Sequence, residues 1–155
     1  MTEQRTLRIG DHAPDFTLKD QHNNDFRLSE LKGRKVLLSF HPLAWTGICA
    51  KQMKALEVNK PKFDDLDTVA VGLSVDSVPT KHAWAKDLEI KETQLLSDFW
   101  PHGQVAALYG LFMENKGISK RANVIIDEDG KVAFLKIYDI PELPDFEEIM
   151  AFLNE

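Results

Sequence analysis

Residues 36–52, VLLSFHPLAWTGICAKQ, decide the fold of this chain. They open with the nearly continuous apolar run Val36–Phe40, which is typical of a short buried strand. Residues 41–47 follow as a loop. From Ile48 to about Asn59 the apolar side chains recur at helical spacing. The stretch therefore predicts a strand that leads through a loop into a helix.

The rest of the chain predicts alternating strands and helices, with Pro61 kinking or restarting the first helix. Strands are expected at Phe16–Leu18, Phe26–Leu28, Val69–Val75, Asn123–Ile126 and Lys131–Tyr138, and further helices at Pro79–Leu88, His102–Tyr109 and Leu143–Leu153. Strand–helix–strand units demand parallel pairs with right-handed crossovers, and the late turn at 127–130 adds an antiparallel strand. We therefore expect an α/β protein of the thioredoxin-like fold, with a mixed central β-sheet and helices on both faces.

The composition is that of one globular domain. The chain has 155 residues, of which 43% are apolar and 28% charged, and its net charge is −6. A chain of this length buries a sizeable core in a single domain, here residues 1–155. Its mildly acidic balance lacks the basic surface that nucleic acid or an anionic membrane attracts, so neither is an expected partner.

The beginning of the chain is polar, and residues 1–15 predict irregular structure without a secretory signal. No apolar run anywhere approaches the roughly 20 residues that a membrane-spanning helix needs. We therefore expect a cytoplasmic protein.

Cys49 is the only cysteine of the chain. A single cysteine excludes an internal disulfide, a CxxC redox pair and a cysteine-based zinc finger. The five histidines are scattered without a ligand spacing, so neither a metal site nor a cofactor is expected. Cys49 is then either an inert buried thiol or a reactive one.

The position of Cys49 favours a reactive thiol. Thr46 is a natural N-cap of the predicted helix, which makes Cys49 its third residue. A thiol there lies among free backbone N–H groups at the positive end of the helix dipole, and these groups stabilise the nucleophilic thiolate. A lone cysteine is more often a small buried apolar residue, so the junction alone leaves both readings open.

The pattern Pro42-x-x-x-Thr46-x-x-Cys49 resembles the active-site signature of the peroxiredoxins, the AhpC/TSA family. Arg121, six residues before Asp127, matches the active-site arginine of that family. The signature together with a correctly placed arginine is a specific signal, whereas Arg121 alone would be an ordinary charge at the end of a strand.

The resemblance runs from about residue 8 to the C-terminus. Residues 10–18 resemble the opening of the family, and residues 72–77 resemble its second core strand. Residues 95–103, LLSDFWPHG, look most like the one-cysteine branch called alkyl hydroperoxide reductase E. The resemblance implies a thiol-dependent peroxidase that reduces hydrogen peroxide and organic hydroperoxides.

The resemblance also implies a role for each matching residue. Cys49 would attack the peroxide, and Thr46 would hydrogen-bond both the thiolate and the incoming peroxide. Arg121 would hold the thiolate by its charge and donate to the peroxide. Pro42 would keep water from the sulfur. The backbone N–H of Ile48, with that of Cys49, would complete the substrate cradle.

Two neighbours of this set have less defined roles. Gln52, one helical turn after Cys49, would help to orient Arg121 at the substrate-binding side of the site. His41 could touch the site or could be an exposed loop residue, and it is not counted among the catalytic residues.

The expected product of the reaction is a sulfenic acid on Cys49. With no second cysteine, an external thiol must recycle it: a thioredoxin, a glutaredoxin-like protein or a low-molecular-weight thiol. A competing reading is a redox-sensing or interaction module that keeps the fold. A thioredoxin-like reductase is a third reading, which the lack of a CxxC motif disfavours.

Aromatic residues near the site predict a homodimer. Trp45 lies in the active-site loop, and Phe99–Pro101 should form another loop. Exposing several large aromatic side chains together is unfavourable, and isologous pairing is the commonest way to cover such a patch. The alternative is that these aromatic residues fold back into the core of their own domain.

Overall fold

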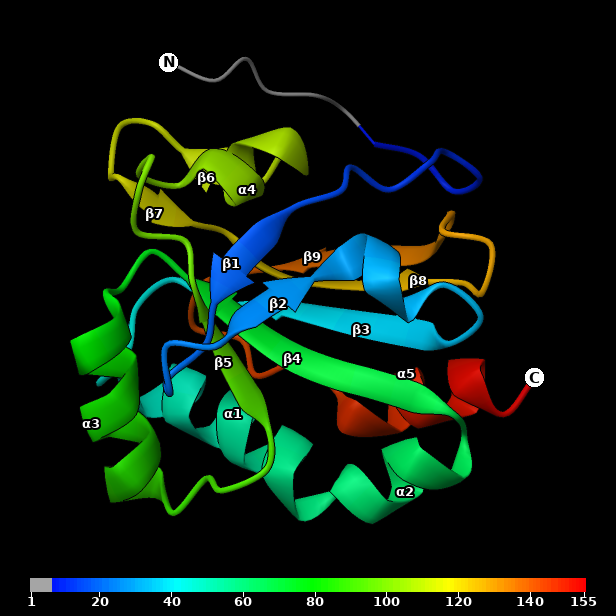
Figure 1. The fold of residues 1–155 in the computed structure, drawn as a ribbon, viewed down its shortest axis with the longest axis horizontal. Coiled ribbons are helices and arrows are strands. Elements are labelled where there is room, and N and C mark those ends of the chain that lie inside the picture. The colour runs from blue at the N-terminus through cyan, green and yellow to red at the C-terminus, as the bar shows by residue number, and fades with distance from the viewer. Residues whose placement is uncertain (1–6) are drawn as a thin grey trace.

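The structure is a computed structural model that describes residues 7–155, and the expectations for residues 1–6 lie outside it. A seven-stranded sheet runs through the molecule in the order β2-β1-β5-β4-β3-β8-β9 (Figure 1). The strands are β1 Thr17–Lys19, β2 Asp25–Arg27, β3 Lys35–Phe40, β4 Thr68–Ser74, β5 Gln94–Ser97, β8 Arg121–Ile126 and β9 Val132–Tyr138. The sheet is mixed, because β4 pairs in parallel with β3 and β5 while the outer pairs are antiparallel.

Helices cover both faces of this sheet. The α-helices are α1 Gly47–Val58, α2 Lys60–Asp65, α3 Val78–Leu88, α4 Gln104–Leu108 and α5 Phe146–Leu153. Smaller elements are the 3-10 helix Leu28–Leu31 and the hairpin of β6 Phe112–Met113 with β7 Ile118–Ser119. In Figure 1, α1, α2 and α5 lie on one side of the sheet, and α4 with the β6–β7 hairpin lies on the other. No helix in the described part of the chain combines the length and apolar character needed to cross a membrane.

The sheet separates two apolar cores, because successive residues of a strand face opposite sides. In β3, Leu37 joins the core that α1, α2, α3 and α5 cover, whereas Val36 and Leu38 join the core under α4. In β8, Ile125 and Val124 divide between the two cores in the same way. The expected mixed sheet with helices on both faces is therefore confirmed.

The structure also corrects several expected boundaries. Residues 94–97 form β5, a strand that the sequence analysis did not predict. The helix expected at His102–Tyr109 is shortened, because Gly103 just before α4 adopts a left-handed φ of 68° that does not continue a helix. The last helix begins at Phe146 rather than at Leu143, where the Asp145 side chain accepts from the backbone N–H of Glu147.

Other expected features are confirmed with small shifts. β1 and β2 form the predicted hairpin, with Thr17 opposite Arg27. Pro61 restarts the helix rather than kinking it, since α1 ends at Val58 and α2 begins at Lys60.

Candidate active site

Cys49 lies in the first turn of α1, where the chain enters the helix from the end of β3. It is the third residue of α1, as expected, and its side chain is completely buried in the core beside α3. Thr46 precedes the helix with an extended backbone, but its hydroxyl does not cap the helix. Instead it donates to the carbonyl oxygen of Leu43 at 2.8 Å, because the active-site loop folds back on itself. The first-turn N–H groups thus receive no side-chain cap and keep their capacity to bind an incoming group.

The guanidinium of Arg121 contacts the sulfur of Cys49. In the antiparallel pairing of β3 with β8, Ala122 lies opposite Phe40, so Arg121 stands just beyond the end of β3. Its Nη1 donates to Cys49 Sγ at 3.4 Å, and the side chain is 2% exposed. Its Nε and Nη2 both donate to the carbonyl oxygen of Ile140, at 3.0 and 2.7 Å. These bonds fix the plane of a group that stays charged throughout the accessible pH range.

Gln52 links Arg121 to the floor of the site. Its Oε1 accepts from Arg121 Nη1 at 2.8 Å. Its Nε2 donates to Ser39 Oγ at 2.7 Å and to the carbonyl oxygen of Phe40 at 3.1 Å. Ser39 Oγ in turn donates to Asn123 Oδ1 at 2.8 Å. Because both ends of the amide have partners, Gln52 can hold the guanidinium in only one orientation.

The loop before the helix is held against β4 and the segment that follows it. The backbone N–H of Ala44 donates to Asp76 Oδ2 at 2.8 Å, and Ser74 Oγ donates to the same oxygen at 2.5 Å. Trp45 then adopts a left-handed φ of 67°, which is unusual for a bulky side chain and typical of strain held at functional sites.

The predicted site residues share this region, but they differ in exposure. Pro42 is buried beside the loop, Thr46 is exposed, and Ile48 is half-buried. The structure brings Arg121 and Gln52 into direct contact with each other and Arg121 into contact with Cys49, whereas no bond joins the Thr46 hydroxyl to the sulfur.

His41 and Lys81 form a polar pair that the sequence analysis did not identify. His41 is completely buried, so the interpretation of an exposed loop residue is wrong. Its Nε2 lies 2.9 Å from Nζ of Lys81 in α3, which is also completely buried. The sequence did carry one signal for Lys81: it lies three residues before Trp84, on the apolar face of its helix.

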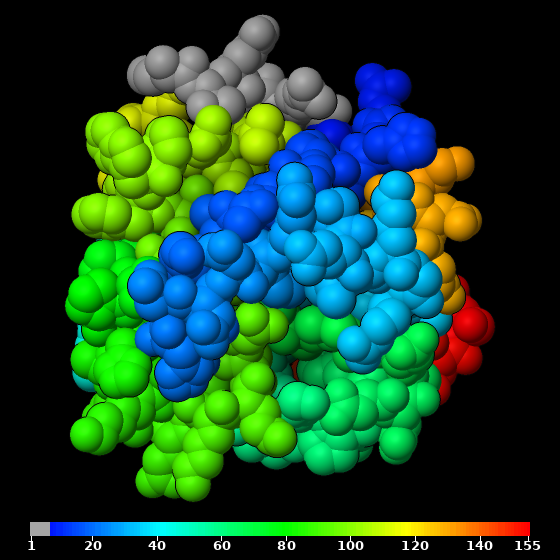
Figure 2. All heavy atoms as spheres, viewed as in Figure 1, coloured from blue at the N-terminus to red at the C-terminus, as the bar shows by residue number. Residues whose placement is uncertain are grey.

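The hollow beside α2 is separate from the predicted site residues. A hollow of about 370 Å³ lies between the β2 region and α2, and none of the predicted site residues lines it. Its opening is visible in Figure 2. Within residues 7–155 no group of three or more His, Cys, Asp or Glu side chains is placed to hold a metal ion.

Comparisons with known proteins identify the family. The profile of the AhpC/TSA family matches residues 9–135. Alkyl hydroperoxide reductase E of Mycobacterium tuberculosis is 41% identical over 140 residues, which cover 90% of this chain and 91% of that protein. The mitochondrial thioredoxin-dependent peroxide reductase of Mus musculus is 31% identical over 158 residues, covering 96% of this chain and 61% of that protein.

A solved structure agrees with this assignment. The reduced 2-Cys peroxiredoxin of Plasmodium vivax superposes with a TM-score of 0.88 at 27% identity, covering 94% of this chain and 80% of that one. The likeness confirms the thioredoxin-like fold that the sequence predicts. From the family profile, the relatives and the buried cysteine beside an arginine, it follows that the chain belongs to the AhpC/TSA family and is a peroxiredoxin with a single cysteine.

Proposed function

We propose that Cys49 is the cysteine through which this peroxiredoxin reduces hydrogen peroxide and organic hydroperoxides. Its thiolate attacks one peroxide oxygen, so that a sulfur–oxygen bond forms and the oxygen–oxygen bond breaks. The other oxygen leaves with the bonding electrons and takes up a proton to become water or an alcohol, and Cys49 becomes a sulfenic acid. The observation that best supports this proposal is the 3.4 Å contact between Arg121 Nη1 and Cys49 Sγ in a buried site.

The surrounding residues supply charge, donors and shielding. The fixed positive charge of Arg121 favours the thiolate and donates to the peroxide as negative charge develops on the leaving oxygen. The uncapped N–H groups of Ile48 and Cys49 are the further donors that line up the two peroxide oxygens. The hydroxyl of Thr46 donates its hydrogen to the carbonyl oxygen of Leu43, so it meets the peroxide as an acceptor of the peroxide O–H. Pro42 keeps water from the sulfur.

Recycling requires a thiol from outside the chain, because the sequence contains no second cysteine. We propose that this thiol first forms a mixed disulfide with Cys49, and that a second thiol then releases it. The relative from Mus musculus is named as thioredoxin-dependent, which supports a thioredoxin as one reductant. A glutaredoxin-like protein and a low-molecular-weight thiol are the other candidates to be tried.

Stopped-flow oxidation of the reduced protein, followed by addition of candidate thiols, tests the function. We expect rapid loss of one thiol per chain, repeated turnover with at least one reductant, and no reaction in Cys49→Ser. A protein that oxidises once and is recycled by none of these thiols would favour the redox-sensor reading instead.

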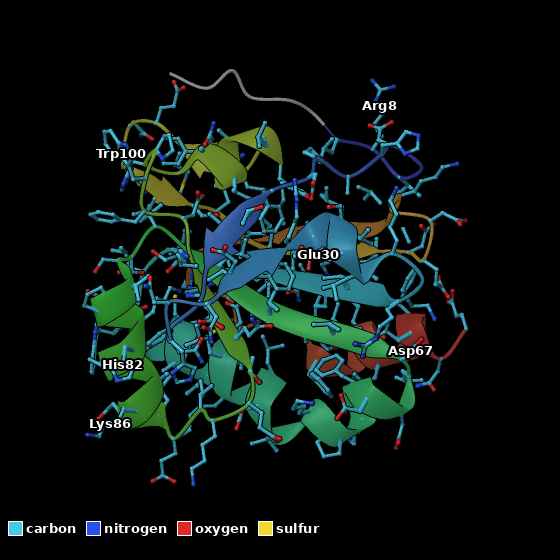
Figure 3. All side chains as sticks on the ribbon, viewed as in Figure 1. Arg8, Glu30, Asp67, His82, Lys86 and Trp100 are labelled. Atoms are coloured by element: carbon cyan, nitrogen blue, oxygen red, sulfur yellow. The ribbon has the colours of Figure 1, made fainter. Side chains whose placement is uncertain are left out.

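We also propose that the protein forms a homodimer through an aromatic patch of Trp45, Phe99 and Trp100. These side chains are 54%, 52% and 81% exposed, so the alternative in which they pack into their own core is wrong. Trp100 lies at the edge of the molecule in the loop before α4 (Figure 3). So much exposed aromatic surface favours a covering partner.

Analytical sedimentation tests the dimer. Trp100→Glu is expected to give a folded monomer, whereas Val58→Glu, a charge placed at a 75% exposed position at the end of α1, should leave the dimer intact. A parent protein that is monomeric at micromolar concentration would contradict the proposal.

The remaining proposals concern the unit and its compartment. We propose that residues 1–155 act as one domain and that the protein works in the cytoplasm, where the thiol pool keeps cysteines reduced. Cell fractionation checks the compartment, and a single cooperative unfolding transition checks the domain.

A further inference from the structure

Lys81 is a buried cation that the proposed reaction does not use. Its side chain is completely buried in α3, although lysine is almost never buried without a partner. Its Nζ lies 2.9 Å from His41 Nε2 and 5.6 Å from the ring centroid of Trp84. A cation held between an imidazole and an aromatic face costs desolvation energy, so its presence next to the candidate active site calls for a functional explanation.

The positive charge of this pair resides on Lys81. Nδ1 of His41 lies 3.4 Å from the carbonyl oxygen of Ser39, which assigns the ring proton to Nδ1 and leaves the lone pair of Nε2 to accept from Lys81. Burial, followed by the charges of Lys81 and Arg121, lowers the pKa of His41 well below its usual range, although the bond to Ser39 opposes this. His41 is therefore a neutral acceptor, and the ammonium is the donor.

Lys81 lies in the same buried region as the active-site sulfur: its Nζ and the ring of His41 both lie against Trp84, which belongs to the same core cluster as Cys49. Burial lowers the pKa of Lys81 to about 7, while the charges of Asp76, the Cys49 thiolate and Asp98 oppose that shift. The charged and titratable groups facing the pair are His41 after β3, Cys49 in α1, Asp76 after β4, Asp98 after β5 and Arg121 in β8.

We propose that Lys81 is a positioning residue of the peroxidase site, whose buried ammonium holds His41 at the start of the active-site loop and adds a second positive charge in favour of the Cys49 thiolate. The inference rests on the proposed role of Cys49. Two observations carry it: His41, which Lys81 holds, directly precedes Pro42, and Trp84, against which both side chains lie, belongs to the same buried cluster as Cys49.

If Lys81 only filled space in the core, an apolar side chain at this position would serve as well. A helix that needed only to fill this space would use an apolar side chain, as replacement of buried ionic groups is often neutral or stabilising. Lys86, five residues further along α3, instead extends from the outer side of the helix into solvent (Figure 3). It therefore provides a matched control on the same element.

The test uses Lys81→Met, the control Lys86→Met, and the double variant Lys81→Met with His41→Phe, which removes both members of the pair. Thiolate absorbance is followed during a pH titration, together with alkylation of Cys49 by iodoacetamide. Peroxide oxidation is followed by stopped flow at pH 7 and at higher pH. The first two measurements need no peroxide, so they test Lys81 even if Cys49 proves not to be the peroxidatic residue.

In Lys81→Met we expect the thiolate to appear at higher pH and oxidation at pH 7 to slow about tenfold, as loss of one neighbouring charge implies. The rate should recover when the pH is raised. The thiolate titration and the oxidation rate of Lys86→Met should equal those of the parent. A folded Lys81→Met whose titration and rate also overlay the parent overturns the proposal.

The double variant covers the case in which Lys81→Met fails to fold because His41 Nε2 has lost its donor. It should then fold and show the same displaced thiolate titration. If neither variant folds, the pair is structural and the proposal is overturned.

Discussion

The two cations beside Cys49 are held in different ways. The guanidinium of Arg121 is anchored by Gln52 and by the carbonyl oxygen of Ile140, and arginine side chains in general are always charged in proteins. The ammonium of Lys81 has one imidazole nitrogen and one aromatic face as neighbours, and burial brings its pKa to about 7. On the proposed mechanism, one sulfur therefore has one neighbour with a permanent charge and a second neighbour whose charge depends on pH.

Removing the permanent charge should have the largest effect. Arg121→Ala deletes the contact to Cys49 Sγ and a donor to the leaving oxygen. Loss of one preorganised donor typically slows a reaction by about 100-fold or more, and we expect that loss in the rate of peroxide oxidation. Circular dichroism checks that the fold survives, and stopped flow on the same sample measures the oxidation rate. Oxidation at the parental rate would show that Arg121 has been assigned wrongly.

Removing the hydrogen bond that orients Arg121, while keeping the arginine itself, should have an intermediate effect on the oxidation rate. Gln52→Leu removes the acceptor at 2.8 Å that orients Arg121, so the guanidinium can leave the line of attack. We expect oxidation to slow about tenfold, within the cost of a misplaced catalytic group. Gln52→Glu keeps the acceptor and should retain most of the activity, and exposed Lys51→Ala in the same helix should change nothing. Equal losses in the Leu and Glu variants would contradict the orienting role.

The titratable charge should be visible in stability as a function of pH. Unfolded Lys81 has a pKa of 10.5 and the folded residue about 7, so between these values the unfolded state binds more protons and stability rises with pH. Below about pH 7 Lys81 is charged in both states, so the whole free-energy cost of burying its ammonium lowers the stability of the protein. The double variant Lys81→Met with His41→Phe should be more stable than the parent at pH 7 by about 1–4 kcal/mol, and the advantage should shrink towards pH 10.

Urea denaturation at pH 7, 8, 9 and 10 measures this difference, with Lys86→Met as the control. Both the parent and the variants carry Cys49→Ser in this series, because histidines titrate mainly below this range whereas a cysteine thiol titrates within it. An advantage that stays constant across the range would mean that Lys81 is not the group responsible.

The outer end of the Gln52 network should have the smallest effect. Tyr138 donates to Glu148 Oε1 at 2.9 Å and accepts from Asn123 at 3.5 Å. It lies opposite Arg121 in the pairing of β8 with β9, but along the hydrogen-bond network three side chains separate the two residues. Tyr138→Phe should cost about 1 kcal/mol of unfolding free energy and leave the oxidation rate within about twofold of the parent. A rate loss as large as that of Gln52→Leu would extend the orienting network to the protein surface.

The parts of the site that are close together in sequence were predictable, and the parts that tertiary packing brings together were not. The spacing of Thr46 and Cys49 correctly predicted the start of α1, because a helix start is a local feature. The resemblance supplied Arg121, which is 72 residues from Cys49 in the chain. Lys81 lies 40 residues from its partner His41, and a lysine on a helix ordinarily reads as a solvated residue.

The missed strand has a similar cause. β5 spans only Gln94–Ser97, too short for its pattern to distinguish a strand from a loop, and it is stabilised by parallel pairing with β4. The sequence predicted that Thr46 caps the helix, but in the structure its hydroxyl makes no cap and donates to the loop instead. Only the folded loop brings the carbonyl oxygen of Leu43 within its reach.

On the proposed mechanism, the complete burial of the Cys49 sulfur ties the catalytic cycle to a motion of the chain. A peroxide is small enough to pass between side chains, but a thiol carried by another protein must bring its own sulfur into line with the oxidised one. That approach requires the first turn of α1 or the loop before it to open. Turnover with a protein reductant can therefore be no faster than this opening. Under a surge of peroxide the same delay leaves the sulfenic acid exposed to a second oxidant molecule before any reductant arrives.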